Sequence, residues 1–340
     1  MNAELLSQFQ SIFKSPKKVI IIGHKNPDGD ALGASLGLYW FLLSQGHQVT
    51  VVMPNDFPEF LQWMPGSGEI LNFEYQGHEV STCLDNADII CTLDFNDLSR
   101  VGTLESLLRS SDKSLVMIDH HQQPSDYAVL TWSDPKMSST SEMIAHLIEA
   151  WTGWNGLSKA MATNLYTGIM TDTGSFKFSA TTAKTHEVVA KLIEAGAKHT
   201  QIHQAVYDNQ SPGRLKLLAR ALANMEIKPS WQTAYTFLSQ NDLDQCNYKK
   251  GDTEGFVNYA LQLQGIKFAI IFIENQNEQL IKISFRSTGD FSVNEFARNH
   301  FDGGGHTNAA GGRYNGRLSE AIDHFLTELP KYKEQLHEIE

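Results

Sequence analysis

Residues 17–33 of this 340-residue chain read KKVIIIGHKNPDGDALG. The apolar run that opens the stretch is typical of a strand buried in a parallel sheet. A simple chain reversal after a strand needs only an Asn-Gly pair, yet here His24, Asp28 and Asp30 follow within seven residues. Three candidate metal ligands on one loop are either the polar residues of a turn or one wall of a metal site.

The pattern of strand and helix recurs along the first half of the chain. We expect strands at 47–54, 87–95 and 113–121, and helices at 31–46, 140–151 and 157–174. Regular alternation of this kind predicts an α/β domain built on a doubly wound, mainly parallel sheet. Ligands of such sheets bind beyond the carboxyl ends of the strands.

The rest of the chain predicts a helical connector and a second, smaller α/β domain. The helical pattern from about residue 184 is interrupted by NQSPGR, in which Pro212 suits the first turn of a helix. Beyond it, TAYTFLS, KFAIIFIE and LIKISFRS predict strands, followed by a helix, FDGGGHTNAAGGRY and a charged C-terminal helix. We predict a first domain at 1–190, a connector at 191–228 and a second domain at 229–340, with the active site in the interdomain cleft.

Composition restricts the classes of partner. The formal net charge is −12 and no Lys/Arg cluster forms a stripe, which argues against long duplex nucleic acid as a partner. Cys83, Cys91 and Cys246 are widely spaced, which suits a reducing cytoplasm. No apolar run reaches the roughly 18 residues of a membrane span. We expect a cytoplasmic protein that meets phosphorylated substrates with metal ions and a few placed cations.

Acids and histidines follow what we take as four strand ends of the first domain. In chain order they are His24, Asp28 and Asp30, then Asp94, then Asp119, His120 and His121, and finally Asp172. Taken singly, Asp94 or Asp172 is more simply explained as a helix cap or a turn acid. Because the carboxyl ends of the strands meet at one cleft, the convergence of all four groups favours a common site.

Clustered aspartates repel one another unless cations neutralise them. Mixed carboxylate and imidazole ligands suit Mn²⁺ or Mg²⁺, with Zn²⁺, Fe²⁺ and Co²⁺ as alternatives. The candidate ligands outnumber a single octahedral shell that keeps water, which favours two ions. Two ions about 3.5–4 Å apart activate a water and clamp both oxygens of an in-line phosphoryl displacement. The chemistry that we predict is phosphoester hydrolysis.

Five motifs in this order resemble the DHH phosphoesterase superfamily. They are HKNPDGDALG, the isolated Asp94 after a strand, DHH at 119–121, Asp172 within TDTG, and GGGH at 303–306. More narrowly, the chain resembles nano-RNase/pAp phosphatase-like proteins with a DHH-associated C-terminal domain. The resemblance extends from about residue 16 to about residue 325.

The resemblance implies a role for each residue of the first domain. One metal ion would be bound by His24 and Asp28, a second by Asp30, His120 and Asp172, and Asp94 would bridge the two. His121 would face the scissile phosphate, and Asp119 would fix an imidazole, as carboxylates beside ligating histidines often do.

The glycine-rich segment of the second domain has two readings. Gly303, Gly304 and Gly305 form a flexible turn, or they expose backbone N–H groups that line a phosphate. His306 adds a hydrogen-bond donor, and Arg286 can bind a phosphate through two parallel hydrogen bonds. The resemblance implies that these residues hold the phosphate or nucleotide end of the substrate across from the metal ions.

We therefore predict a metal-dependent phosphoesterase that hydrolyses very short RNA to 5′-mononucleotides, and pAp to AMP. The cofactors expected are two divalent ions, Mn²⁺ first, with Mg²⁺ or Co²⁺ as alternatives; the protein is compatible with a homodimer. One alternative is a phosphodiesterase for linear or cyclic dinucleotides such as pApA and c-di-AMP. An alternative of another class is a nucleotide-binding protein without turnover, which the intact set of candidate ligands disfavours.

Overall fold

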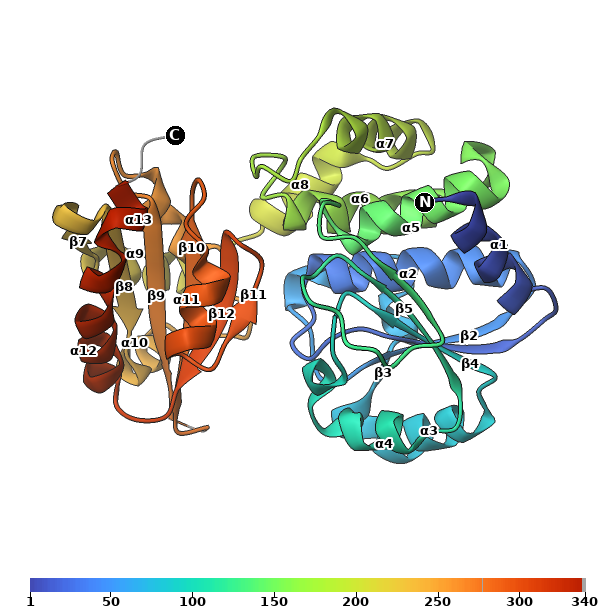
Figure 1. The fold of residues 1–340 in the computed structure, drawn as a ribbon, viewed down its shortest axis with the longest axis horizontal. Coiled ribbons are helices and arrows are strands. Elements are labelled where there is room, and N and C mark those ends of the chain that lie inside the picture. The colour runs from blue at the N-terminus through green and yellow to red at the C-terminus, as the bar shows by residue number, and fades with distance from the viewer. Residues whose placement is uncertain (277, 338–340) are drawn as a thin grey trace. The chain divides into compact units, whose positions relative to one another are not determined.

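The computed structural model describes residues 1–276 and 278–337, which form two compact units, Met1–Asn209 and Gln210–Glu340 (Figure 1). The division between the units lies inside the predicted connector, and the predicted domain boundaries remain a prediction. Across the described residues, no helix combines the length and the apolar character needed to cross a membrane.

The first unit is built on a six-stranded, fully parallel sheet. Its strands are β1 (Lys18–Ile22), β2 (Gln48–Met53), β3 (Leu71–Asn72), β4 (Ile89–Leu93), β5 (Ser114–Asp119) and β6 (Leu130–Ser133). They lie in the order β3-β2-β1-β4-β5-β6, and every pair of neighbours is parallel. This order is that of a doubly wound sheet, so the predicted fold class is confirmed. The short strands β3 and β6 were not expected.

Helices cover both faces of this sheet (Figure 1). On one face lie α1 (Ala3–Ile12), α2 (Gly29–Ser44), α5 (Thr140–Thr152) and α6 (Lys159–Asp172), and on the other α3 (Phe73–Asn86) and α4 (Glu105–Ser110). Residues of β1 alternate between the two cores, with Val19 and Ile21 in one and Ile20 and Ile22 in the other. A strand buried on both faces reads as a continuous apolar run, which explains the sequence pattern.

Close packing between α2 and α6 brings together the two helices that carry Asp30 and Asp172. A Cβ atom at Gly33 would lie 2.7 Å from the backbone oxygen of Asn164 and 2.9 Å from the Cα atom of Gly168. A side chain at residue 33 would therefore force the helices apart. The glycine after the metal-ligand motif is thus required by packing.

The expectation that Asp172 follows a strand is wrong, because Asp172 is the last residue of α6. The helical pattern of residues 157–174 extends to this aspartate without a break. The chain then turns through Gly174, Ser175 and Phe176, whose φ values of 56°, 61° and 67° are all left-handed. Asp172 thus reaches the other candidates from the end of a helix that packs against α2.

Two more helices complete the first unit, and short 3₁₀ helices connect its elements. The helices are α7 (Ala183–Glu194) and α8 (His199–Tyr207), whose apolar residues join the core of α2 and α6. The 3₁₀ helices are Glu59–Leu61, Ser67–Glu69, Leu98–Leu104 and Trp154–Gly156.

The second unit contains a six-stranded mixed sheet with helices on both faces. Its strands are β7 (Glu226–Lys228), β8 (Thr233–Leu238), β9 (Phe268–Asn275), β10 (Leu280–Ser287), β11 (Gly304–Gly305) and β12 (Ala309–Tyr314), in the order β11-β12-β10-β9-β8-β7. The β8–β9 pair is parallel and the others are antiparallel. The prediction of a smaller second α/β domain is confirmed.

One face of the second sheet packs on α9 (Pro212–Ala223) and α10 (Gln240–Gln245). The other packs on α11 (Val293–His300), α12 (Leu318–Glu328) and α13 (Lys333–His337). Short 3₁₀ helices lie at Pro229–Trp231, Phe256–Gln262 and Leu329–Tyr332. Pro212 is the first residue of α9, as expected.

Candidate metal centre

The topology of the first sheet gathers the candidate residues at one edge. Neighbouring strands β1 and β4 lie where the winding of the sheet reverses, and ligands of doubly wound sheets bind beyond the carboxyl ends of such strands. Asp94 follows β4 directly, Asp119 is the last residue of β5, and the loop after β1 carries His24. The strand order therefore brings side chains that are far apart in the sequence to the same place.

Three of these side chains form a first group. Nε2 of His24 lies 3.7 Å from Oδ2 of Asp28 and 3.5 Å from Oδ2 of Asp94. Oδ1 of Asp28 accepts hydrogen bonds from the backbone N–H groups of Asp30 and Ala31 and so caps the start of α2. The helix cap holds the Asp28 carboxylate in position while its other oxygen faces His24.

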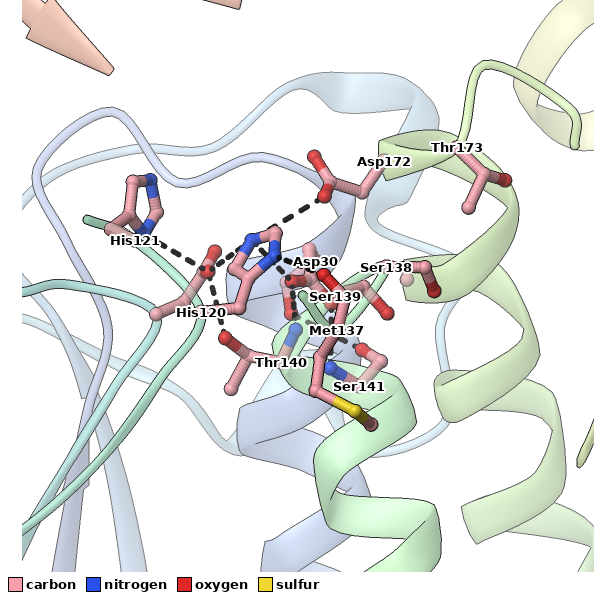
Figure 2. A network of polar contacts seen from close by, with 12 residues as sticks. Asp30, His120, His121, Met137, Ser138, Ser139, Thr140, Ser141, Asp172 and Thr173 are labelled. Atoms are coloured by element: carbon pink, nitrogen blue, oxygen red, sulfur yellow. Dashed lines mark hydrogen bonds and ion pairs between the residues drawn. The ribbon is translucent and has the colours of Figure 1, made fainter. Parts of the chain in front are cut away.

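A second group surrounds His120, as Figure 2 shows. Nε2 of His120 lies 3.4 Å from Oδ2 of Asp172, 3.5 Å from Oδ1 of Asp94 and 3.8 Å from Oδ2 of Asp30. Asp94 therefore has one carboxylate oxygen towards each group, Oδ2 towards His24 and Oδ1 towards His120. The geometry brings together all six candidate ligands and places Asp94 between the two groups.

The protonation of the two imidazoles tests whether the groups suit metal ions. Nδ1 of His24 lies 2.9 Å from the backbone oxygen of Lys25, and Nδ1 of His120 lies 3.2 Å from that of Met137. A carbonyl oxygen only accepts, so each Nδ1 carries the proton. Nε2 of each ring then faces carboxylate oxygens, an arrangement that is favourable only when a metal ion or a second proton lies between the nitrogen and these oxygens.

The distances within each group also fit a shared cation. Ligand bonds of about 2.1 Å separate two neighbouring ligands of one ion by about 3.0–3.5 Å in octahedral or tetrahedral geometry. The contacts of 3.4–3.8 Å between Nε2 and carboxylate oxygens are close to this range. The donor set and its spacing therefore fit divalent metal ions.

Electrostatics show that the site has an excess of negative charge. Burial and the charges of Asp30 and Asp28 raise the pKa of Asp94 well above its usual value, although its hydrogen bond with His24 works in the opposite direction. Burial alone would lower the pKa of His24, but Asp28 and Asp94 outweigh this effect and raise it to about 10. Without metal ions, protons bound to these side chains therefore neutralise part of the negative charge.

The backbone at Asp94 has a rare conformation. Its φ value is 66°, in the left-handed region that few residues other than glycine adopt, with Asp and Asn among the exceptions. The backbone N–H of Asp94 donates to the oxygen of Ile118 at 3.1 Å, which fixes this residue to β5. Conformations of this kind cluster at functional sites, where the surrounding structure enforces them.

Asp119 contacts His121, which belongs to neither of the two groups of candidate ligands. Nδ1 of His121 lies 2.7 Å from Oδ1 of Asp119, which is fully buried. Burial lowers the pKa of His121 and Asp119 raises it, while His120 and Arg100 lower it further, so that the net shift is downward. A carboxylate at the end of β5 therefore orients the His121 ring.

In the second unit, the glycine-rich segment is part of the sheet. Gly304 and Gly305 form β11, and the backbone N–H of Gly303 donates to the oxygen of Ala297 at 3.2 Å. A Cβ atom at Gly303 would lie 2.1 Å from the oxygen of Gly311. Glycine is required here for close backbone approach, and the Gly303 N–H is engaged within the unit rather than presented to a phosphate.

Arg286 and His306 belong to this end of the second sheet. Arg286 lies on β10 opposite Ala309 of β12, and the backbone N–H of His306 donates to the oxygen of Ala309 at 2.7 Å. Backbone pairing thus places both residues beside Ala309. The structure places Arg286 and His306 in the second unit and the six candidate ligands in the first.

Sequence reasoning missed three residues of these sites. Thr140 and Ser141, at the start of α5, contact the carboxylates of Asp94 and Asp30. Nε of Arg298 would lie 3.6 Å from a Cβ atom at Gly304, so a further cation lies beside the glycine segment. For Thr140 and Ser141, the sequence did contain a signal. The Ser139-Thr-Ser-Glu142 pattern marks the start of a helix, and this helix begins at the edge of the sheet where the candidate ligands lie.

Comparison with known proteins identifies the class. Residues 18–169 match the model of the DHH family, N-terminal domain, and residues 230–335 match that of the DHHA1 domain. A crystal structure of an exopolyphosphatase-related protein from Bacteroides fragilis is 38% identical, with a TM-score of 0.93 and coverage of 99% of this chain and 98% of that one. The chain belongs to the DHH family of phosphoesterases.

Two further relatives indicate the branch of the family. A Streptococcus mutans protein named as a probable bifunctional oligoribonuclease and PAP phosphatase, NrnA, is 29% identical over 88% of this chain and 90% of its own length. A Bacillus subtilis cyclic-di-AMP phosphodiesterase, GdpP, is 25% identical over 98% of this chain but 51% of its own length. Family membership and the clusters of acids and histidines together identify a metal-dependent hydrolase.

Proposed function

We propose that this protein is a two-metal phosphoesterase that hydrolyses very short RNA oligonucleotides to 5′-mononucleotides, and pAp to AMP. The observation that carries the proposal is the pair of ligand groups, His24/Asp28/Asp94 and Asp30/His120/Asp172, with Asp94 between them. The substrate assignment is supported by the match to the oligoribonuclease and PAP phosphatase of S. mutans, which extends over nearly the whole of both chains.

The six ligand residues would hold one divalent ion in each group. Ions bound there would supply Lewis-acid stabilisation of phosphoryl oxygens and a water of lowered pKa. We propose Mn²⁺, with Mg²⁺ or Co²⁺ as alternatives, because carboxylates dominate the donor set and two imidazoles complete it. The chain's own task is to hold these donors at fixed distances, which the cap at Asp28 and the packing of α2 on α6 serve.

His121 acts on the scissile phosphate in this proposal. Its Nδ1 is engaged by Asp119, so Nε2 is the ring atom that meets the substrate. An incoming phosphate anion favours the charged imidazolium, against the downward pKa shift that burial causes. The imidazolium then donates a hydrogen bond to a phosphoryl oxygen, and Asp119 keeps the ring in the orientation that this requires.

The second unit binds the end of the substrate that does not react. Arg286, His306, Gly304 and Gly305 supply its contacts to a phosphate, whereas the N–H of Gly303 is engaged within the unit. Arg298 adds a cation beside Gly304. The net charge of −12 leaves few cations for a long backbone, and affinity for long nucleic acid depends on many phosphate contacts. The substrate is therefore short, a few nucleotides at most.

A dinucleotide phosphodiesterase is the second candidate. It is favoured by the match to the cyclic-di-AMP phosphodiesterase of B. subtilis, which includes both units of this chain. The match extends over about half the length of that protein. The match to the oligoribonuclease and PAP phosphatase of S. mutans, over 88% of this chain and 90% of that protein, supports short RNA and pAp as the preferred substrates.

The test is a substrate panel with purified protein and Mn²⁺. RNAs of two to five nucleotides, pApA among them, and pAp should be hydrolysed well above a 20-mer, duplex RNA and c-di-AMP, with 5′-mononucleotides as the RNA products. Turnover of c-di-AMP, or of pApA, that is much faster than turnover of RNAs of three to five nucleotides would select the dinucleotide function instead. Binding of nucleotides without any turnover would contradict both enzymatic assignments.

A further inference from the structure

The start of α5 is buried against the candidate metal centre. Residues 138–141 read SSTS, and all four are buried. Oγ of Ser139 accepts from the backbone N–H of Glu142 at 3.0 Å and caps the helix. The cap fixes where α5 begins, and so it fixes the position of the next residue, Thr140, whose exposed fraction is 0%.

Thr140 makes hydrogen bonds to two different candidate ligands, Asp94 and Asp30; Figure 2 shows Thr140 beside Asp30 and His120. Its hydroxyl donates to Oδ1 of Asp94 at 2.9 Å, and its backbone N–H donates to Oδ2 of Asp30 at 2.7 Å. These are the same oxygens that lie 3.5 and 3.8 Å from Nε2 of His120. A single residue therefore contacts two of the three carboxylate oxygens that lie around the His120 nitrogen.

The two carboxylates are held in different ways. Asp30 receives backbone N–H groups from Thr140 and from Ser141, the latter at 2.8 Å, at the positive end of the α5 dipole. These backbone bonds are independent of side-chain identity. Asp94 instead accepts a hydrogen bond from the side-chain hydroxyl of Thr140 at 2.9 Å. Its contacts to His24, His120 and His121 are longer, at 3.5–3.8 Å, so the Thr140 hydroxyl is the shortest of the contacts that orient this carboxylate.

We propose that Thr140 is a positioning residue that sets the rotation of the Asp94 carboxylate, and thereby lets one aspartate serve both ligand groups. The inference rests on the proposed function, since it assumes that both groups bind metal ions. Oδ1 is fixed by Thr140 towards His120, and this leaves Oδ2 facing His24. Without the hydroxyl, the carboxylate rotates, and the geometry of both groups is lost together.

The Thr140→Val variant isolates this contact. Valine keeps the shape of threonine and the backbone N–H to Asp30, but it removes the hydroxyl. Loss of a residue that orients a metal ligand typically costs 10- to 100-fold in metal affinity or activity. We expect Mn²⁺ affinity and kcat to fall by about that factor, with KM for a short RNA nearly unchanged. Thr140→Ser, which retains the hydroxyl, should stay within about threefold of wild type.

The matched control is Thr167→Val in α6. Thr167 is equally buried, but its hydroxyl donates to the backbone oxygen of Thr163 at 2.8 Å instead of to a carboxylate. The same change of atoms at this residue should leave Mn²⁺ affinity unaltered. Circular dichroism of each variant in EDTA compares the stability of the metal-free proteins, so a loss of folding is distinguished from a loss of metal affinity.

The readout is Mn²⁺ binding measured by electron paramagnetic resonance of the free ion, alongside kcat and KM. Wild-type protein that binds no Mn²⁺ would defeat the proposed function itself. A Thr140→Val protein with wild-type Mn²⁺ affinity would overturn the positioning role while leaving that function intact. A more than tenfold loss of Mn²⁺ affinity in Thr140→Ser would also overturn the positioning role, because serine keeps the hydroxyl. This second variant tests the proposal even if Thr140→Val does not fold.

Discussion

The two units present their polar groups in contrasting ways. In the first, the carboxylates of Asp30 and Asp94 are buried and receive hydrogen bonds from another element, α5. In the second, Arg286 and His306 are only half-buried, and the segment near them consists of glycines in close backbone contact. Buried, fixed donors suit chemistry that needs fixed distances. Half-exposed donors suit binding of a substrate end whose position varies with substrate length.

The most direct test of the first unit is Asp94→Asn, for which we expect the largest effect on activity. The amide keeps the shape of the residue and tolerates the left-handed backbone, but it removes the charge shared by both ligand groups. Activity should fall by more than about 100-fold, beyond the loss typical of residues that only orient a ligand. Metal content by mass spectrometry should fall below two ions per chain.

Its control is Asp97→Asn, three residues further along. Asp97 accepts hydrogen bonds from Ser99 and Ser125 and contacts no candidate ligand. Activity and metal content should stay near wild type. Two bound ions and more than a tenth of normal activity in Asp94→Asn would refute the bridging role.

Asp119→Asn tests the residue behind His121, with a smaller expected effect. Because Asp119 raises the pKa of His121, its removal should lower that pKa further and weaken the imidazolium. We expect kcat to fall by about 10- to 100-fold, with full metal content and a pH–rate profile moved to lower pH. An unchanged profile would show that Asp119 does not act through His121.

Arg286→Ala examines the second unit, and its effect should depend on the substrate. Loss of a charge-assisted contact to phosphate costs roughly 1.5–3 kcal/mol, about tenfold to a hundredfold in kcat/KM on short RNA. Bis-p-nitrophenyl phosphate has no second phosphate, so its hydrolysis should be nearly unaffected. Arg313→Ala is the control, since Arg313 pairs with Asp302 on an exposed surface. Equal damage to both substrates would place Arg286 with the chemistry instead.

The smallest effect that we expect is a pH dependence at His24. In the metal-free protein, Asp28 and Asp94 raise the pKa of His24 to about 10, from about 6.5. The resulting stabilisation is complete below about pH 6.5 and is lost as pH rises through 10. Urea unfolding of protein in EDTA should therefore show wild type losing stability relative to His24→Gln between pH 7 and 10. Parallel curves for the two proteins would contradict the shift.

Much of the first unit was predictable because buried parallel strands have a strong sequence signal. The apolar run before His24 and the later runs that end at Asp94 and Asp119 fixed the class of sheet and the edge where the ligands gather. The signal was weak for β6, only four residues long with alternating burial. Asp172 was assigned to a strand end because the other candidates lie there, although its own helical pattern continues to the end of α6.

The sequence by itself determined that the chain has two α/β domains, that it resembles the DHH family, and which types of side chain are candidate ligands. The tertiary structure alone decided how those ligands are held. Thr140 is 46 residues from Asp94 and 110 from Asp30 along the chain, and no local pattern connects them. Periodicity and motifs report which residues share an element, whereas contacts between elements depend on packing, such as that of α2 on α6 at Gly33. For that reason the candidate ligands could be named from the sequence, while the residues that orient them required the fold.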